Sequence, residues 1–288
     1  MIETKITSTL VIPNVCNMKP PCPYCESNFT YDTSMNVDKW TDGLLDLNKY
    51  GAFKFIIGNG EAFNNLDFLN IVNNISDTNT FVIASNLISH IDNFKIIKNY
   101  SNVSIASSFH PHYWNINGWI DAFCDKIKLL STDVGVDVCG INVVAYPLYF
   151  DTLKDMCEEL TDKSNIKAGL IHFYGKYGGL QYPHSYSLDQ LRIMDRINGI
   201  SNNNIDKDER LAYLNSKGHL CYVGNKYVFI MKDGQVWSCY SGDNNGYYLG
   251  DIFKKNVTLL DGPKPCLSQQ CGCEMMWNEY AKPLILSG

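Results

Sequence analysis

The sequence has few charged residues, no basic excess and no long apolar run. Its 288 residues are 19% charged, and the formal net charge is −6. No basic face is offered to a phosphate backbone, so a dedicated nucleic-acid binder is not expected. No stretch approaches the roughly 20 apolar residues of a membrane span, and the first residues lack the pattern of a signal peptide. We therefore expect a cytoplasmic protein that binds neither nucleic acid nor membrane and acts on a small molecule or a peptide.

Cysteine, in contrast, is abundant. There are eleven cysteines in a chain that is too large for a disulfide-stapled secreted domain and has no signal sequence. The count is also odd, which does not suit complete disulfide pairing. Metal ligation is the role that this composition favours.

Short β-branched runs alternate with amphipathic stretches over the first two thirds of the chain. This alternation predicts repeated β-α units and a parallel sheet covered on both faces. Helix faces are indicated by Trp40, Leu44 and Leu47, and by Ile120, Cys124 and Ile127. The expected strands are 5–12, 52–58, 80–85, 102–108, 136–145 and 166–173.

A polar, Asn-rich stretch at 197–210 is typical of a linker. It divides the chain into a predicted first domain, 1–196, and a second domain, 211–288. The second domain contains an expected β-hairpin that turns at Lys232-Asp233-Gly234.

Cys16, Cys22 and Cys25 form C-x5-C-x2-C directly after the first expected strand. Three thiolates cannot fill the four iron corners of a [4Fe–4S] cluster. One iron stays open, and the amino and carboxylate groups of S-adenosylmethionine could chelate it. The spacing alone leaves a zinc site or another kind of iron–sulfur site open.

This cysteine group resembles that of the radical S-adenosylmethionine superfamily, whose usual spacing is C-x3-C-x2-C with an aromatic residue, here Tyr24, before the last cysteine. The first interval is two residues longer than usual. Gly58-Asn59-Gly60-Glu61, after the second strand, is similar to the family's Gly-Gly-Glu-Pro motif. Without the cysteines, it reads as an ordinary strand-to-helix turn. Together with the cysteines, the backbone carbonyls that the glycines leave accessible and the Glu61 carboxylate beside them suit the binding of an ammonium group.

The resemblance implies an α/β fold with a partial (β/α)6 barrel and a small C-terminal hairpin-plus-helix iron–sulfur domain. It also implies S-adenosylmethionine, a catalytic [4Fe–4S] cluster and a flavodoxin- or ferredoxin-type electron donor. The strand ends of such a barrel line its site. The candidate S-adenosylmethionine contacts there are Ser85, Asn86, Ser108 and Asn142, which as single residues could equally cap strand ends.

The C-terminal cysteines form a second group. Cys221 and Cys239 bracket the hairpin, and Cys266, Cys271 and Cys273 follow as C-x4-C-x-C. This segment resembles the twitch or SPASM domains, which hold an auxiliary [4Fe–4S] cluster. The resemblance implies Cys221, Cys239 and two of the last three as ligands, with a structural zinc knuckle as the alternative.

Cys124, Cys139 and Cys157 lie in apolar surroundings without partners at ligand spacing and are expected in the core. His110, His112 and His172 lie in the segments expected at the mouth of the barrel. A neutral imidazole there could accept a proton in catalysis, although a packed histidine beside aromatic residues is the commoner case.

The resemblance implies that an electron from the cluster breaks the S–C5′ bond of S-adenosylmethionine, giving methionine and a 5′-deoxyadenosyl radical that abstracts hydrogen from the substrate. Because the first strand starts almost at Met1, without a leader-binding segment, we expect a small polar metabolite such as a sugar, aminocyclitol or nucleotide derivative, undergoing oxidation or epimerisation. The alternative is a maturase that cross-links, oxidises or epimerises a peptide side chain. A third hypothesis is a zinc or iron–sulfur binding protein without catalysis.

Overall fold

The computed structural model describes residues 2, 6–13, 16–19, 21–25, 34–200, 216–241, 244–269, 271 and 281–282. Within them, one curved sheet has the strand order β14-β11-β10-β1-β2-β3-β4-β5-β6. Strands β1 to β6 pair in parallel, each with the next. They span Ile6–Leu10, Phe53–Ile57, Thr80–Ser85, Val103–Phe109, Asp137–Val144 and Ala168–Ile171.

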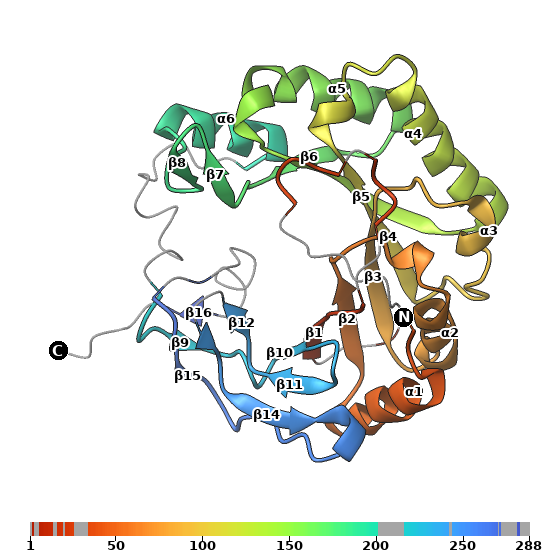
Figure 1. The fold of residues 1–288 in the computed structure, drawn as a ribbon, viewed down its shortest axis with the longest axis vertical. Helices are drawn as coiled ribbons and strands as arrows, with labels where there is room; N and C mark the ends of the chain where they lie inside the picture. Colours follow the sequence, from red (N-terminus) through yellow and green to blue (C-terminus); the bar gives the residue numbers. More distant parts are fainter. Residues whose placement is uncertain are drawn as a thin grey trace.

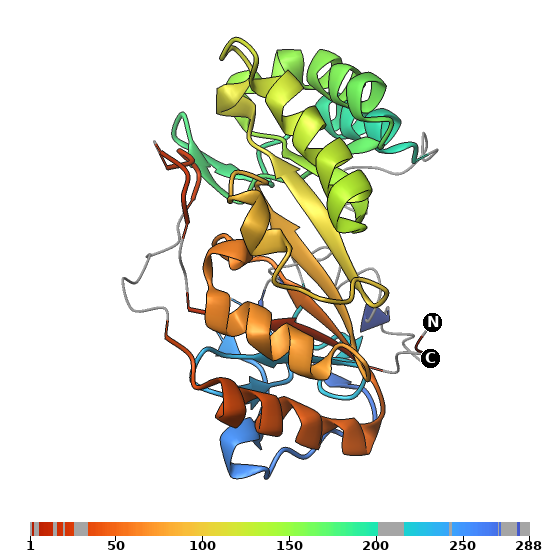
Figure 2. The ribbon, with the colours of Figure 1, turned by 90° about the vertical axis from the view of Figure 1, so that its right-hand side faces the viewer.

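Helices cover the convex side of this sheet, as Figure 1 shows. They are α1 (Val37–Asp46), α2 (Leu66–Ile75), α3 (Ile91–Phe94), α4 (Trp119–Leu129), α5 (Leu153–Ser164) and α6 (Leu188–Asn198). Residues alternate along each strand, so one set is buried under the helices and the other is partly exposed. Figure 2 shows α1 and α2 along one end of the sheet and α4 and α5 along the other.

Local sequence explains where several helices begin and end. The side chain of Asn65 accepts a hydrogen bond from Phe68 N at the start of α2. Ser187 and Gln190 form a reciprocal capping box at the start of α6, and Gly199 ends that helix in the left-handed conformation.

All six strands predicted in the first two thirds of the chain are confirmed, with ends that differ by at most two residues. The predicted helix faces are also confirmed, since Trp40, Leu44, Ile120, Cys124 and Ile127 are buried. The partial barrel predicted from the resemblance is therefore the observed architecture.

The prediction that Cys139 belongs to the core is wrong. Its neighbours on β5, Val138 and Gly140, pair with Ile105 and Ala106 of β4, which leaves Cys139 as the extra residue of a bulge. The bulge turns its side chain to solvent, and Cys139 is exposed. Cys124 and Cys157, in contrast, are buried as expected.

The described strands of the C-terminal segment are β9 (Leu220–Cys221), β10 (Tyr227–Ile230), β11 (Gln235–Trp237), β12 (Tyr240–Ser241), β13 (Asn244–Asn245), β14 (Tyr248–Asp251), β15 (Lys264–Pro265) and β16 (Ala281–Lys282). Of these, β10, β11 and β14 extend the main sheet, β9, β15 and β16 form a second sheet, and β12 pairs with β13. The expected hairpin is present as β10 and β11. Strand β10 pairs in parallel with β1, so the sheet continues across the expected linker.

The division into two domains at 197–210 stays a prediction, and residues 201–210 lie outside the described residues. No α-helix occurs among the described residues after Ser216, so the helix of the predicted C-terminal domain also stays a prediction.

None of the helices among the described residues has the length and apolar character needed to cross a membrane.

Candidate active site

The first three cysteines lie around one pocket of about 180 Å³. They sit on the loop that follows β1, and the pocket opens at the carboxyl ends of β2, β3 and β4, where the side chains of a parallel barrel converge. Its remaining lining residues are Met18, Tyr24, Gly58, Gly60, Ala84, Ser85, Asn86, Ser108 and His110. The structure thus brings together the cysteine motif and most of the residues predicted to bind S-adenosylmethionine.

The three thiols are close enough to affect one another. Burial raises the pKa of Cys22 to about 12, and the neighbouring Cys25 and Cys16 contribute to this rise. Burial also raises the pKa of Cys16, with smaller contributions from Glu61 and Cys25. Because iron binds thiolates, loading of this site must release the thiol protons.

The donor set fits an iron–sulfur cluster. Among the described residues, no group of three or more His, Cys, Asp or Glu side chains is placed so that it could hold a single metal ion. A [4Fe–4S] cluster binds each thiolate to a different iron, so its ligands need not meet at one point. Three thiols that share one small pocket suit such a group.

Asn59 connects the ends of the first two strands. Its Nδ2 donates to Ile12 O at 2.7 Å, and its Oδ1 accepts from Ile12 N at 3.4 Å. Asn59 does not line the pocket. It therefore anchors the start of the cysteine loop to β2.

Glu61 is fully buried and does not line the pocket. Its carboxylate accepts from Asn86 N at 2.8 Å, from Ser85 Oγ at 2.9 Å and from Phe63 N at 3.3 Å. Burial nevertheless raises its pKa to about 7, against the opposing effect of these donors. In this structure Glu61 joins the turn after β2 to the end of β3, and contact with an ammonium group stays a prediction.

Asn86 links the end of β3 to the cysteine loop. Its Nδ2 donates to Asn17 Oδ1 at 2.8 Å and lies 3.9 Å from Cys16 Sγ. Asn17 in turn donates to Ser89 Oγ at 3.3 Å. Asn17 and Ser89 are polar neighbours of the site that sequence reasoning missed, because only the fold brings residues so far apart in the chain together.

His110 is the histidine that reaches the cysteines. Its Nδ1 lies 2.8 Å from the Tyr24 hydroxyl oxygen and 3.2 Å from Cys22 Sγ. Burial lowers the pKa of His110 to about 4, with a smaller effect from His112. The imidazole is therefore neutral near pH 7.

Aromatic rings pack around Tyr24. The centroid of Tyr24 lies 5.2 Å from that of Tyr146 and 6.4 Å from that of Phe173, and Tyr146 lies 5.1 Å from Phe173. Tyr146 directly follows the fifth predicted strand, a position that could have singled it out. The two segments expected at the barrel mouth do meet around Tyr24.

The other predicted site residues, His112, His172 and Asn142, do not line the pocket. His112 is tilted against Tyr113, and its ring nitrogens are buried without a hydrogen-bond partner among the described residues. Burial lowers its pKa. His172 packs near Tyr186 and does not line the pocket. Asn142 pairs with Ser108 on the neighbouring strand, next to the pocket lining.

The C-terminal cysteines also gather. Cys239 and Cys271 pack against the buried cluster that Cys221 forms with Tyr227. Cys266 follows β15, which pairs with β9, and its charge would raise the pKa of both Cys221 and Cys239. The main cause of the raised pKa at Cys221 and Cys239, to about 11 for Cys239, is burial. Cys273 lies outside the described residues.

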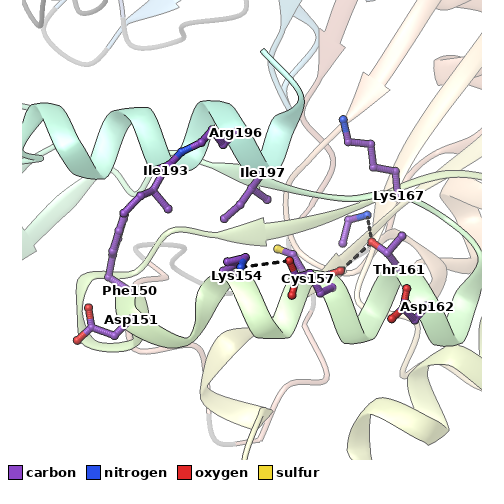
Figure 3. Close-up of a pocket in the computed structure, with 12 residues that line it drawn as sticks. Phe150, Asp151, Lys154, Cys157, Thr161, Asp162, Lys167, Ile193, Arg196 and Ile197 are labelled. Atoms are coloured by element: carbon purple, nitrogen blue, oxygen red, sulfur yellow. Dashed lines mark hydrogen bonds and ion pairs between the residues drawn. The ribbon is translucent and has the colours of Figure 1, made fainter. Parts of the chain in front are cut away.

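A larger pocket of about 650 Å³ lies between α5 and α6 and is lined by none of the cysteines predicted to hold a cluster (Figure 3). Cys157 and Thr161 of α5 face Ile193 and Ile197 of α6 across it. Its rim carries acidic and basic residues in equal number, and no set of polar groups converges in it. It offers no chemistry comparable with that of the cysteine pocket.

Comparison with solved structures shows the same fold in proteins that bind S-adenosylmethionine. SuiB from Streptococcus suis matches with a TM-score of 0.60 at 15% identity, over 87% of this chain and 64% of SuiB. SuiB has been crystallised bound to S-adenosylmethionine and to its precursor peptide SuiA. The protein anSMEcpe with bound AdoMet matches with a TM-score of 0.59 at 16% identity, over 87% of this chain and 76% of that protein.

The chain thus spans less than two thirds of the length of SuiB. No protein-family model matches it, and no curated protein matches its sequence. At this level of identity the likeness shows the fold, and the predicted partial barrel is confirmed.

Proposed function

We propose that the chain is a radical S-adenosylmethionine enzyme that acts on a peptide or protein side chain. The observation that carries this proposal is the gathering of Cys16, Cys22 and Cys25 around one pocket at the carboxyl ends of the barrel strands. The shared fold of S-adenosylmethionine-bound proteins supports it.

In this proposal Cys16, Cys22 and Cys25 hold a [4Fe–4S] cluster whose fourth iron takes the methionine end of S-adenosylmethionine. When bound, the cluster supplies the electron that breaks the sulfonium S–C5′ bond and starts hydrogen abstraction. Asn86 and Ser108 line the pocket and offer polar groups to the nucleotide. Tyr24 lines the pocket, and its ring would help to keep water from the reacting carbon.

The peptide is preferred as substrate because of the comparisons. SuiB has been crystallised with the peptide SuiA, and anSMEcpe with the Cp18Cys and Kp18Cys peptides. These complexes outweigh the sequence argument for a small metabolite, which depended on where the first strand begins. The second of the two tests below, which measures deuterium transfer, can still identify a metabolite as the substrate.

The C-terminal cysteines would hold an auxiliary [4Fe–4S] cluster. Cys221, Cys239, Cys266 and Cys271 supply four thiols in one part of the fold. Cys273 is a fifth candidate outside the described residues, and two of Cys266, Cys271 and Cys273 would complete the four ligands of one cluster together with Cys221 and Cys239.

The decisive test is anaerobic reconstitution with iron and sulfide, reduction with dithionite and measurement of 5′-deoxyadenosine formed from S-adenosylmethionine. We expect formation by the wild type and loss of it in a Cys16→Ala, Cys22→Ala, Cys25→Ala triple variant. Cys139→Ala is the matched control, because this exposed thiol lies on the β5 bulge. Equal product from the triple variant and the wild type would refute the proposal.

The substrate class can be tested with the same material. Candidate peptides and sugar or nucleotide metabolites carrying deuterium at unactivated carbons are added, and deuterium in 5′-deoxyadenosine is measured by mass spectrometry. We expect transfer from a peptide. Transfer from metabolites alone would restore the first hypothesis from sequence.

A further inference from the structure

We infer that His110 and Tyr24 donate hydrogen bonds to the sulfur of Cys22 and thereby raise the reduction potential of the cluster that this cysteine binds. The inference rests on the proposed function. It gives His110 a positioning and tuning role, which differs from the proton acceptor expected from sequence.

Three side chains converge on one point. His110 Nδ1 lies 3.2 Å from Cys22 Sγ and 2.8 Å from the Tyr24 oxygen. The Tyr24 hydroxyl and the Cys22 sulfur thus lie next to the same ring nitrogen. Cys22 and His110 are 88 residues apart in the chain, so the fold creates this contact.

The chemistry of an iron-bound thiolate fixes the direction of these bonds. The sulfur of a thiolate ligand has no proton and can only accept. In this inference His110 presents Nδ1–H toward the sulfur and the Tyr24 oxygen, which leaves the Tyr24 hydroxyl proton free to donate to the sulfur. Each donor stabilises the extra negative charge of the reduced cluster, and hydrogen bonds to the sulfurs are among the factors that set cluster potentials.

The donors are held in place from both sides. His110 directly follows β4, and Pro111 begins the short 3₁₀ turn after it. The Tyr24 ring packs against Tyr146 and Phe173. A fixed donor tunes a ligand more effectively than a mobile one, because its bond is formed without further ordering.

The other two cysteines have different surroundings. Cys16 Sγ lies 3.9 Å from Asn86 Nδ2, and the backbone N–H groups of Asn17 and Met18 also interact with it. Cys25 is exposed. Within the described residues, Cys22 is therefore the predicted ligand that a histidine side chain contacts.

The test is a redox titration of the reconstituted protein followed by electron paramagnetic resonance. The signal of this cluster is identified by its change when S-adenosylmethionine is added. In His110→Leu we expect the ratio of reduced to oxidised cluster at a fixed applied potential to fall about tenfold, which is about 59 mV for a one-electron couple. Tyr24→Phe should shift the ratio in the same direction.

Two variants separate tuning from a general structural effect. His110→Asn places an amide N–H near the position of Nδ1 and should restore the wild-type ratio. Tyr146→Phe removes a hydroxyl from the same aromatic cluster without touching the cysteine, and should leave the ratio unchanged. After exchange into D₂O, pulsed electron–nuclear double resonance should show an exchangeable hydrogen coupled to the cluster in the wild type and in His110→Asn. The coupling should be weaker in His110→Leu.

The outcomes distinguish the two levels of the argument. If the wild type cleaves S-adenosylmethionine but His110→Leu has an unchanged ratio and an unchanged proton coupling, the tuning role is refuted and the proposed function stands. If the wild type binds no cluster at the first cysteines, both are refuted.

Discussion

Glu61 combines complete burial with a carboxylate that three donors contact. Burial raises its pKa from 4.5 to about 7, so folding favours the protonated form. Below pH 4.5 the group is protonated in both the folded and the unfolded protein and has no effect. Between pH 4.5 and 7 the unfolded chain loses the proton first, so the free energy of unfolding falls as pH rises, by about 3 kcal/mol in total.

The measurement is urea unfolding of the metal-free protein between pH 4.5 and 8. Glu61→Gln is neutral throughout this range, and its free energy of unfolding should lack the fall of about 3 kcal/mol seen in the wild type. The comparison concerns the dependence on pH, since the variant also alters the hydrogen bond from Asn86 N. Parallel curves for the two proteins would contradict the raised pKa.

At the residue scale, sequence reasoning found the right places but could not assign the contacts. The cysteine motif and Gly60, Ser85, Asn86 and Ser108 do line one pocket. Asn59 and Glu61 belong to the same short motif as Gly60, yet their side chains bind the ends of neighbouring strands and do not line the pocket. Motif spacing fixes which residues are near the strand ends, whereas rotamer and hydrogen-bond choices depend on the assembled neighbours.

At the scale of elements, the open edge of β6 is closed by one side chain. Asn198 Oδ1 accepts from Leu170 N at 2.7 Å, and Asn198 Nδ2 donates to Leu170 O at 2.9 Å. The amide thus takes the place of a neighbouring strand, a means of blocking unwanted strand pairing.

Asn198→Ala should lower the free energy of unfolding by about 1–3 kcal/mol, because it leaves a backbone N–H and C=O without this partner. Urea unfolding measures the change, and light scattering should detect more self-association through the uncovered edge. The matched control is Asn74→Ala on α2, where the amide reaches Thr41 near the surface, with an expected change within about 0.5 kcal/mol. Equal effects of the two substitutions would show that the amide does not protect the edge.

A second element contact depends on the absence of a side chain. A Cβ on Gly43 of α1 would lie 3.0 Å from Ile252 O, in the short 3₁₀ turn Ile252–Lys254 after β14. We expect Gly43→Val to destabilise the protein by about 1–3 kcal/mol through overpacking. Gly140→Val adds the same group where nothing lies within 4 Å and serves as the control. Thermal unfolding of both variants tests this, and an unaffected Gly43→Val protein would refute close packing of α1 on the turn.

Elements were predictable because their signals are local. Each of the six parallel strands is an apolar run buried under helices, and such runs stand out in the sequence. The bulge at Cys139 was not predictable, since a run of apolar residues carries no sign of one unpaired position. The pairing of β10 with β1 was missed for a related reason: it joins residues about 220 positions apart, such as Thr7 and Tyr227.

At the scale of the whole molecule, this pairing makes the C-terminal strands part of the main core. Val228, Ile230, Val236 and Leu249 lie in the same buried cluster as the residues under α1 and α2. We expect a chain truncated after Ile200 to lose cooperative unfolding, because β1 loses one of its two partner strands. Calorimetry of the full and truncated chains measures this, and a truncated chain with an unchanged melting temperature would favour independent domains.

The position of β1 between β10 and β2 also sets an order of events during translation. At about 5–20 residues per second, roughly 10–40 seconds pass between synthesis of β1 and synthesis of its partner β10. Throughout this interval the edge of β1 that will pair with β10 stays uncovered, next to the first cysteines. The sheet can be completed only when most of the polypeptide has left the ribosome, so the nascent chain must tolerate an uncovered strand edge until then.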